Sequence, residues 1–96
     1  RWFHYGMTSN DVVDTAQALQ IRQAAALIRE LAEQLAEILK QRAFEFTDAV
    51  QIGRTHGIHA EPITFGWKLA LFYDEIRRNL ERLDLAAEQI RYGKIS

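Results

Sequence analysis

The chain has 96 residues and a formal net charge of -1 at pH 7, with 48% apolar and 26% charged residues. This balance is typical of one small globular domain, and the near-neutral charge gives no indication of nucleic acid or an anionic membrane as a partner. Cysteine is absent, which excludes disulfides and thiol chemistry in this segment and fits a cytoplasmic protein. No apolar run approaches the roughly 18 residues that a membrane span requires, so we expect no membrane partner.

A first long helix is predicted over residues 9–43. Ser9 is a good N-cap, and Asp11 and Asp14 place negative charge in the first turns, where the helix dipole favours it. No Gly or Pro interrupts the segment that follows, which is rich in good helix formers. A helix of this length, roughly 50 Å, suits an extended bundle better than a compact domain.

The apolar residues of this first helix form a stripe. They recur at steps of mostly three or four: Val12, Ala16, Leu19, Ala24, Leu27 or Ile28, Leu31, Leu35, Ile38 and Leu39. The charged residues between them, such as Arg29 and Glu33 one turn apart, are expected on a solvated outer face.

The helical period is lost between Phe44 and Ile52, where residues 49–52 could form a short extended piece. A second helix is predicted over residues 62–91, with Pro62 in its first turn. Gly66 either weakens that turn or permits close packing. The expected fold class is therefore all-α, with two long antiparallel helices (about 9–43 and 62–91) joined by an irregular linker that carries the chemical motif, as part of a larger helical bundle.

Polar groups gather at the start of the first helix. Thr8 and Ser9 could bind an anion through their hydroxyls and the free N–H groups of the first helical turn, with His4 nearby in sequence. The plainer reading is that they only cap the helix, which needs a single hydroxyl.

The linker holds the other two polar clusters, Arg54-Thr55-His56 and His59 with Glu61. His56 could act as a general acid or base because imidazole titrates near neutral pH, or it could be a loop histidine bonded to the backbone. The spacing of His56 and His59 occurs in metal proteins, but no further ligand cluster supports a metal site, so we expect none.

Two segments also resemble a known family. Residues 54–66 (RTHGIHAEPITFG) and residues 4–15 (HYGMTSNDVVDT) are similar to two signatures of the adenylosuccinate lyase family, within the fumarase/aspartase superfamily. The resemblance covers essentially the whole chain. It implies that residues 1–96 are a fragment of the lyase's central helical-bundle domain, without a complete second domain. The start at Arg1, without Met, also leads us to expect a piece of a longer protein.

The resemblance implies a lyase of purine biosynthesis that releases fumarate from adenylosuccinate, and from the related succinylcarboxamide ribotide, by β-elimination. It implies a nucleotide substrate, no metal or organic cofactor, and a cytoplasmic homotetramer with active sites shared between subunits. His56 matches the general acid of the family, while Thr8 and Ser9 match residues that hold a carboxylate. Thr55 matches the partner beside the acid, and His4 matches a histidine that contacts the substrate.

The length of the first helix supports shared sites. Ser9 begins that helix and His56 lies beyond its other end, so one straight copy would separate them by roughly 50 Å. The family's loop serine, with its accompanying lysine and asparagine, has no match in this chain, so we expect the fragment alone to be inactive.

Two other interpretations stay open. The parent protein could be another superfamily lyase, such as argininosuccinate lyase, fumarase or the muconate cycloisomerase, although residues 57–62 favour adenylosuccinate lyase. The segment could also be a non-catalytic helical hairpin that serves oligomerisation.

Overall fold

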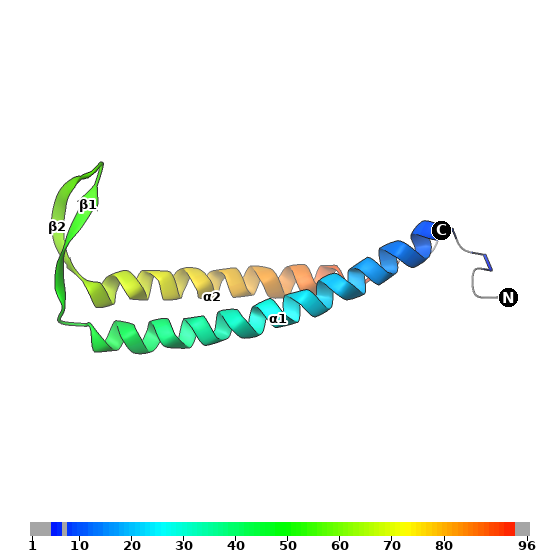
Figure 1. The fold of residues 1–96 in the computed structure, drawn as a ribbon, viewed down its shortest axis with the longest axis horizontal. Helices are drawn as coiled ribbons and strands as arrows, with labels where there is room; N and C mark the ends of the chain where they lie inside the picture. Colours follow the sequence, from blue (N-terminus) through cyan, green and yellow to red (C-terminus); the bar gives the residue numbers. More distant parts are fainter. Residues whose placement is uncertain (1–4, 7, 94–96) are drawn as a thin grey trace. The chain divides into compact units, whose positions relative to one another are not determined.

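The computed structural model describes residues 5–6 and 8–93, and its elements follow the order helix, strand, strand, helix (Figure 1). Helix α1 spans Ser9–Glu45 and helix α2 spans Phe65–Gln89. The prediction of two long helices is confirmed: α1 starts at the predicted residue, and the other three ends differ by two or three residues.

The linker is an antiparallel β-hairpin rather than the irregular segment predicted. Strand β1 spans Val50–Thr55 and strand β2 spans Ile58–Thr64. The placement of Pro62 in a helical turn was wrong, because Pro62 lies in β2 opposite Ile52. Proline is tolerated there because each strand of a two-stranded sheet is an edge strand, and its missing N–H need not belong to the ladder.

Two compact parts make up the chain, and each contains a segment of both helices. The first part runs from Leu31 to Leu80 and includes the hairpin. Ala36 and Leu80 are its most buried apolar side chains, 1% and 4% exposed. Glu33 of α1 accepts a hydrogen bond from Arg77 of α2 over 2.8 Å.

The second part contains the described residues up to Glu30 and those from Glu81 onward. Ala25 and Asp11 are its buried residues. Arg29 of α1 donates to Asp84 of α2 over 2.7 Å. Arg29 and Glu33 are therefore half-buried and paired with α2, and the expectation that they lie on an outer, solvated face was wrong.

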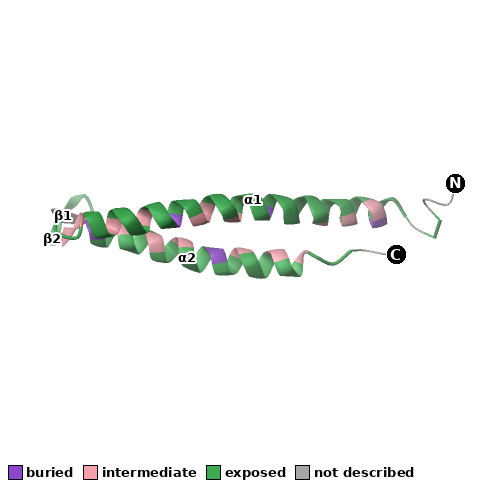
Figure 2. Cartoon of the chain, turned by 90° about the horizontal axis from the view of Figure 1, so that it is seen from below, coloured by how far each residue is buried: buried purple, intermediate pink, exposed green. Residues whose placement is uncertain are grey.

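Most of the surface of α1 is exposed, with buried and half-buried positions scattered along it (Figure 2). Alanines are the most frequent residues at these positions, and Leu39 is the one leucine of α1 among them. The alanines with buried or half-buried positions are Ala18, Ala25, Ala32, Ala36 and Ala43. Most of the predicted apolar stripe is exposed instead, including Leu19, Leu27, Ile28, Leu31, Leu35 and Ile38. Small side chains are suited to close helix packing, and the long apolar side chains of α1 lie on a face that the described residues do not cover. Among the described residues, neither helix combines the length and hydropathy that crossing a bilayer requires.

Candidate active site

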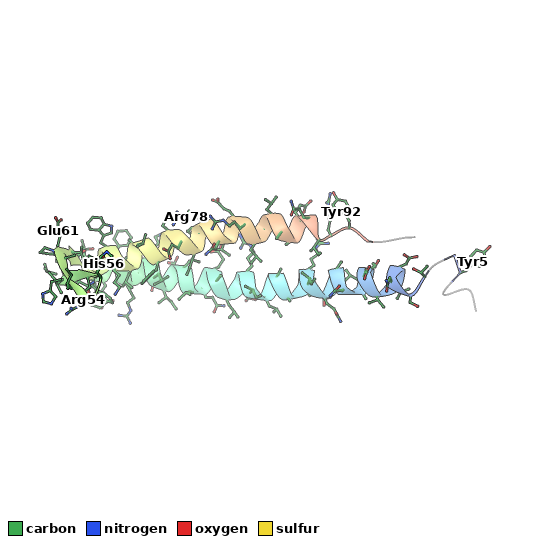
Figure 3. The ribbon with its side chains drawn as sticks, turned by 90° about the horizontal axis from the view of Figure 1, so that it is seen from above. Tyr5, Arg54, His56, Glu61, Arg78 and Tyr92 are labelled. Carbon is green, nitrogen blue, oxygen red and sulfur yellow. The ribbon has the colours of Figure 1, made fainter. Side chains whose placement is uncertain are left out.

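The hairpin presents His56 at its tip. Thr55 pairs with Ile58, so the loop consists of only His56 and Gly57. Both loop residues have positive φ, 52° for His56 and 75° for Gly57, which is the backbone pattern of a type I′ turn. Glycine adopts this conformation freely, whereas histidine rarely does. Figure 3 shows His56 in the hairpin together with Arg54 and Glu61.

A bulge bends the hairpin below this tip. The register shifts between Ile52 and Arg54, where Gly53 alone opposes Ala60 and Glu61 of β2. A Cβ atom at Gly53 would lie 2.8 Å from the backbone oxygen of Glu61, so only glycine fits. Such bulges reorient the end of a ribbon, and this one sits between the helices and the histidine motif.

The start of α2, at the base of the hairpin, is fixed to residues 46–49, which follow the end of α1. The Phe65 N–H donates to Ala49 O over 2.8 Å, and the Gly66 N–H donates to Phe46 O over 3.0 Å. The rings of Phe46 and Phe65 meet edge to face, with centroids 5.2 Å apart. Gly66 is buried because the backbone of α1 passes directly over it. The close-packing alternative for Gly66 is therefore correct, and it holds the histidine motif at a defined place in this part of the chain.

The polar side chains of the hairpin are available to outside groups. Arg54 lies opposite His59 across the ladder, and Arg54, Thr55, His56, His59 and Glu61 are all exposed. Within the described residues, none of these five side chains forms a hydrogen bond or ion pair with the rest of the chain. The interpretation of His56 as a loop histidine bonded to the backbone is thus not supported.

A hollow of about 600 Å³ lies between the hairpin and the first turns of α2. Arg54 and Gln51 from β1, and Lys68 and Trp67 from α2, contribute its polar and aromatic lining. Neither Thr55 nor His56 belongs to it. The sequence did not single out Lys68 or Trp67, because both occupy ordinary exposed positions of a helical pattern.

The second cluster lies at the start of α1, in the other compact part. Thr8 immediately precedes the helix and Ser9 is its first residue. The N-cap is thus Thr8, one residue before the predicted cap. The Thr8 N–H donates to Asp11 Oδ2 over 3.0 Å, and the Asp11 N–H donates to Thr8 O over 3.1 Å.

The hydroxyls of Thr8 and Ser9 are exposed, and no partner for them is found among the described residues. They lie where the free N–H groups of a first helical turn favour an anion. His4, the third predicted member of this cluster, lies outside the described residues.

The structure thus places Thr8 beside Ser9 and Thr55 beside His56, each pair within its own compact part. No group of three or more His, Cys, Asp or Glu side chains within residues 5–6 and 8–93 is arranged to hold a metal ion. Asp11 was predicted only to place a favourable charge in the first helical turn, and its contact with Thr8 was not predicted. The spacing Thr-x-x-acid, typical of a capping box, was the available signal.

Comparisons with known proteins agree on one family. The chain is 53% identical to adenylosuccinate lyase of Aquifex aeolicus and 50% identical to that of Bacillus subtilis, over all 96 residues and 22% of each relative. The fold matches a fumarate lyase from Mesorhizobium sp. BNC1, with a TM-score of 0.93 and 36% identity over 99% of this chain and 22% of that one. It also matches β-carboxy-cis,cis-muconate cycloisomerase from Acinetobacter calcoaceticus, with a TM-score of 0.94 and 34% identity over the same shares.

The chain therefore spans about a fifth of the length of the relatives it matches. A family model described as lyase matches residues 1–96. Since that match covers the whole chain, the chain belongs to the lyase family.

Proposed function

We propose that the full-length protein containing this chain is an adenylosuccinate lyase, which splits adenylosuccinate into AMP and fumarate and cleaves the related succinylcarboxamide ribotide in the same way. The observation that carries this proposal is the identity of about half of all residues with adenylosuccinate lyases across the entire chain, including both signature segments. The direct test is fumarate release from adenylosuccinate by the purified full-length protein.

In the proposed reaction, His56 is the general acid. The departing amine nitrogen needs a proton, which an imidazolium within hydrogen-bond reach can donate. The exposed position of His56 at the tip of a two-residue turn supports this role, because its ring is not engaged by its own chain. Thr55, the neighbouring residue, is proposed to bind the substrate beside the acid.

Thr8 and Ser9 are proposed to bind a carboxylate of the succinyl group. Elimination next to a carboxylate increases the negative charge on that carboxylate, and fixed hydrogen-bond donors stabilise the charge. Two exposed hydroxyls at a helix start supply such donors. His4 is proposed to contact the nucleotide part of the substrate. The elimination itself requires no metal or organic cofactor.

The two clusters are proposed to serve different active sites of a cytoplasmic homotetramer. Helix α1 has 37 residues, Ser9 begins it, and His56 follows its end in the other compact part of the chain. A straight helix of 37 residues would measure about 55 Å at the usual rise per residue. The exposed apolar face of α1 supports oligomerisation, since a contiguous apolar face of this kind marks a protein interface.

Subunit complementation tests the shared sites. A full-length Ser9→Ala protein and a full-length His56→Ala protein, each impaired alone, are mixed under conditions of subunit exchange. Sites that combine an intact Ser9 with an intact His56 from different subunits should restore part of the activity. A mixture that exchanges subunits but recovers nothing beyond its separate components counts against shared sites.

The fold similarity to a muconate cycloisomerase favours one specific alternative, a different reaction within the same superfamily. Assays of the full-length protein on adenylosuccinate, argininosuccinate and a carboxymuconate decide between them. If the full-length protein converts none of these substrates, the chain is interpreted as a non-catalytic hairpin.

A further inference from the structure

We infer that Asp11 is a positioning residue, which fixes Thr8 at the start of α1 so that the Thr8 and Ser9 hydroxyls meet the substrate's carboxylate. The inference rests on the proposed function, because that proposal assigns the carboxylate to Thr8 and Ser9. Asp11 itself is not proposed to touch the substrate.

Asp11 is much more buried than its neighbours in the sequence. Thr8, Ser9 and Asn10 are exposed, whereas Asp11 is 2% exposed and is the buried polar side chain of the described residues. A buried carboxylate is costly unless it is hydrogen-bonded. Its position is therefore determined by its partners rather than by solvent.

Hydrogen bonds connect Asp11 to its neighbours in the first turns of α1. Its Oδ2 accepts from the Thr8 N–H over 3.0 Å, and its own N–H donates to Thr8 O over 3.1 Å. The hydroxyl of Thr15 donates to Asp11 O over 2.7 Å. The N–H and the carbonyl of Thr8 are thus both hydrogen-bonded to Asp11. The Thr8 hydroxyl is the group that can donate to a ligand.

Charge and hydrogen bonding at Asp11 act in opposite directions on anion binding. The negative carboxylate lies in the first helical turn and disfavours a second negative charge nearby. The hydrogen bond to Thr8 favours binding, because it orders the donors before the ligand arrives. Asparagine removes the charge and keeps an acceptor, whereas alanine removes both, so the two effects can be measured separately.

The experiment compares Asp11→Asn, Asp11→Ala and Asp11→Leu in the full-length enzyme, with Asp14→Ala as the matched control. Asp14 is an exposed acidic residue near the same helix start. The measured quantities are kcat and KM for adenylosuccinate and the inhibition constant of fumarate. Leucine has the branched heavy-atom skeleton of Asp, with methyl groups in place of the acceptor oxygens, so it removes the hydrogen bond without leaving an empty space.

We expect Asp11→Ala and Asp11→Leu to raise KM and the fumarate inhibition constant about tenfold, which corresponds to about 1.4 kcal/mol. Asp11→Asn should bind fumarate as tightly as wild type or more tightly, and Asp14→Ala should match wild type. Hydrogen exchange at the Thr8 amide, measured without substrate, should accelerate in the Ala and Leu variants but not in the Asn variant.

Two results would overturn the role of Asp11 without affecting the proposed function. In the first, the wild type is active and its Ala and Leu variants bind fumarate normally. In the second, the Asn variant loses as much fumarate binding as the Ala variant. A wild-type enzyme that does not cleave adenylosuccinate overturns the proposed function instead. The exchange measurement distinguishes the cases, because it reports the Thr8 contact without any turnover.

Discussion

Replacing Gly66 with alanine tests how the hairpin is attached to α1. A Cβ atom at this position would lie 2.4 Å from Ala43 O, 2.8 Å from Phe46 O and 2.9 Å from Phe46 C. All three are backbone atoms, from the last turn of α1 and from the residue after it, so they cannot move aside as the end of a flexible side chain could. The substitution must displace the start of α2 or the end of α1.

The cost follows from overpacking and from one weakened hydrogen bond. Forcing a methyl group into a close-packed contact costs about 1–3 kcal/mol, and weakening the Gly66–Phe46 bond of 3.0 Å costs about 1 kcal/mol more. Alanine recovers up to about 1 kcal/mol through its higher helix propensity. We therefore expect a net destabilisation of about 2 kcal/mol.

Urea unfolding of the full-length protein measures this cost, with Gly93→Ala as the control. The nearest atoms to a Cβ at Gly93 belong to the side chain of Thr15, at 3.4 Å, so this variant should unfold like wild type. The Gly66 variant should unfold at clearly lower urea. Equal midpoints for both variants would refute the reasoning that backbone contact makes glycine necessary at position 66.

Three further predictions follow from the same structure. His56→Gln should lower kcat on adenylosuccinate about 10²–10⁴-fold while leaving the unfolding midpoint unchanged, because the ring is exposed; a normal kcat excludes His56 as the acid. Ala36→Leu should destabilise the protein by about 1–3 kcal/mol, since Ala36 is 1% exposed. The control Ala24→Leu, on the exposed side of α1, should have little effect. Equal unfolding midpoints for the two leucine variants would contradict the burial of Ala36. The isolated 96-residue chain should release no fumarate from adenylosuccinate above background in a spectrophotometric assay; measurable turnover would show that the loop serine of the family is dispensable.

The local pattern of the sequence was sufficient for the helices, whereas the resemblance to the lyase family selected the candidate residues. An uninterrupted run of helix formers after Thr8-Ser9 places the start of α1 within one residue, since capping and propensity are local effects. The pairs Thr8-Ser9 and Thr55-His56 are neighbours in the sequence, so their proximity needs no tertiary information.

Tertiary structure decided which face of each helix is buried and where the linker forms strands. Periodicity shows that α1 carries leucines and alanines, but not which side meets α2. In the structure, alanines such as Ala25 and Ala36 occupy the buried positions of α1, and leucines such as Leu31 and Leu35 are exposed. The hairpin escaped prediction because its turn is His56-Gly57, not the common Asn-Gly, and because Pro62 resembles a helix start. The roles of Gly66 and Asp11 depend on contacts that no single-residue preference encodes. The backbone of Ala43 and Phe46 leaves no room for a Cβ at Gly66, and Asp11 supplies a buried acceptor for the Thr8 N–H.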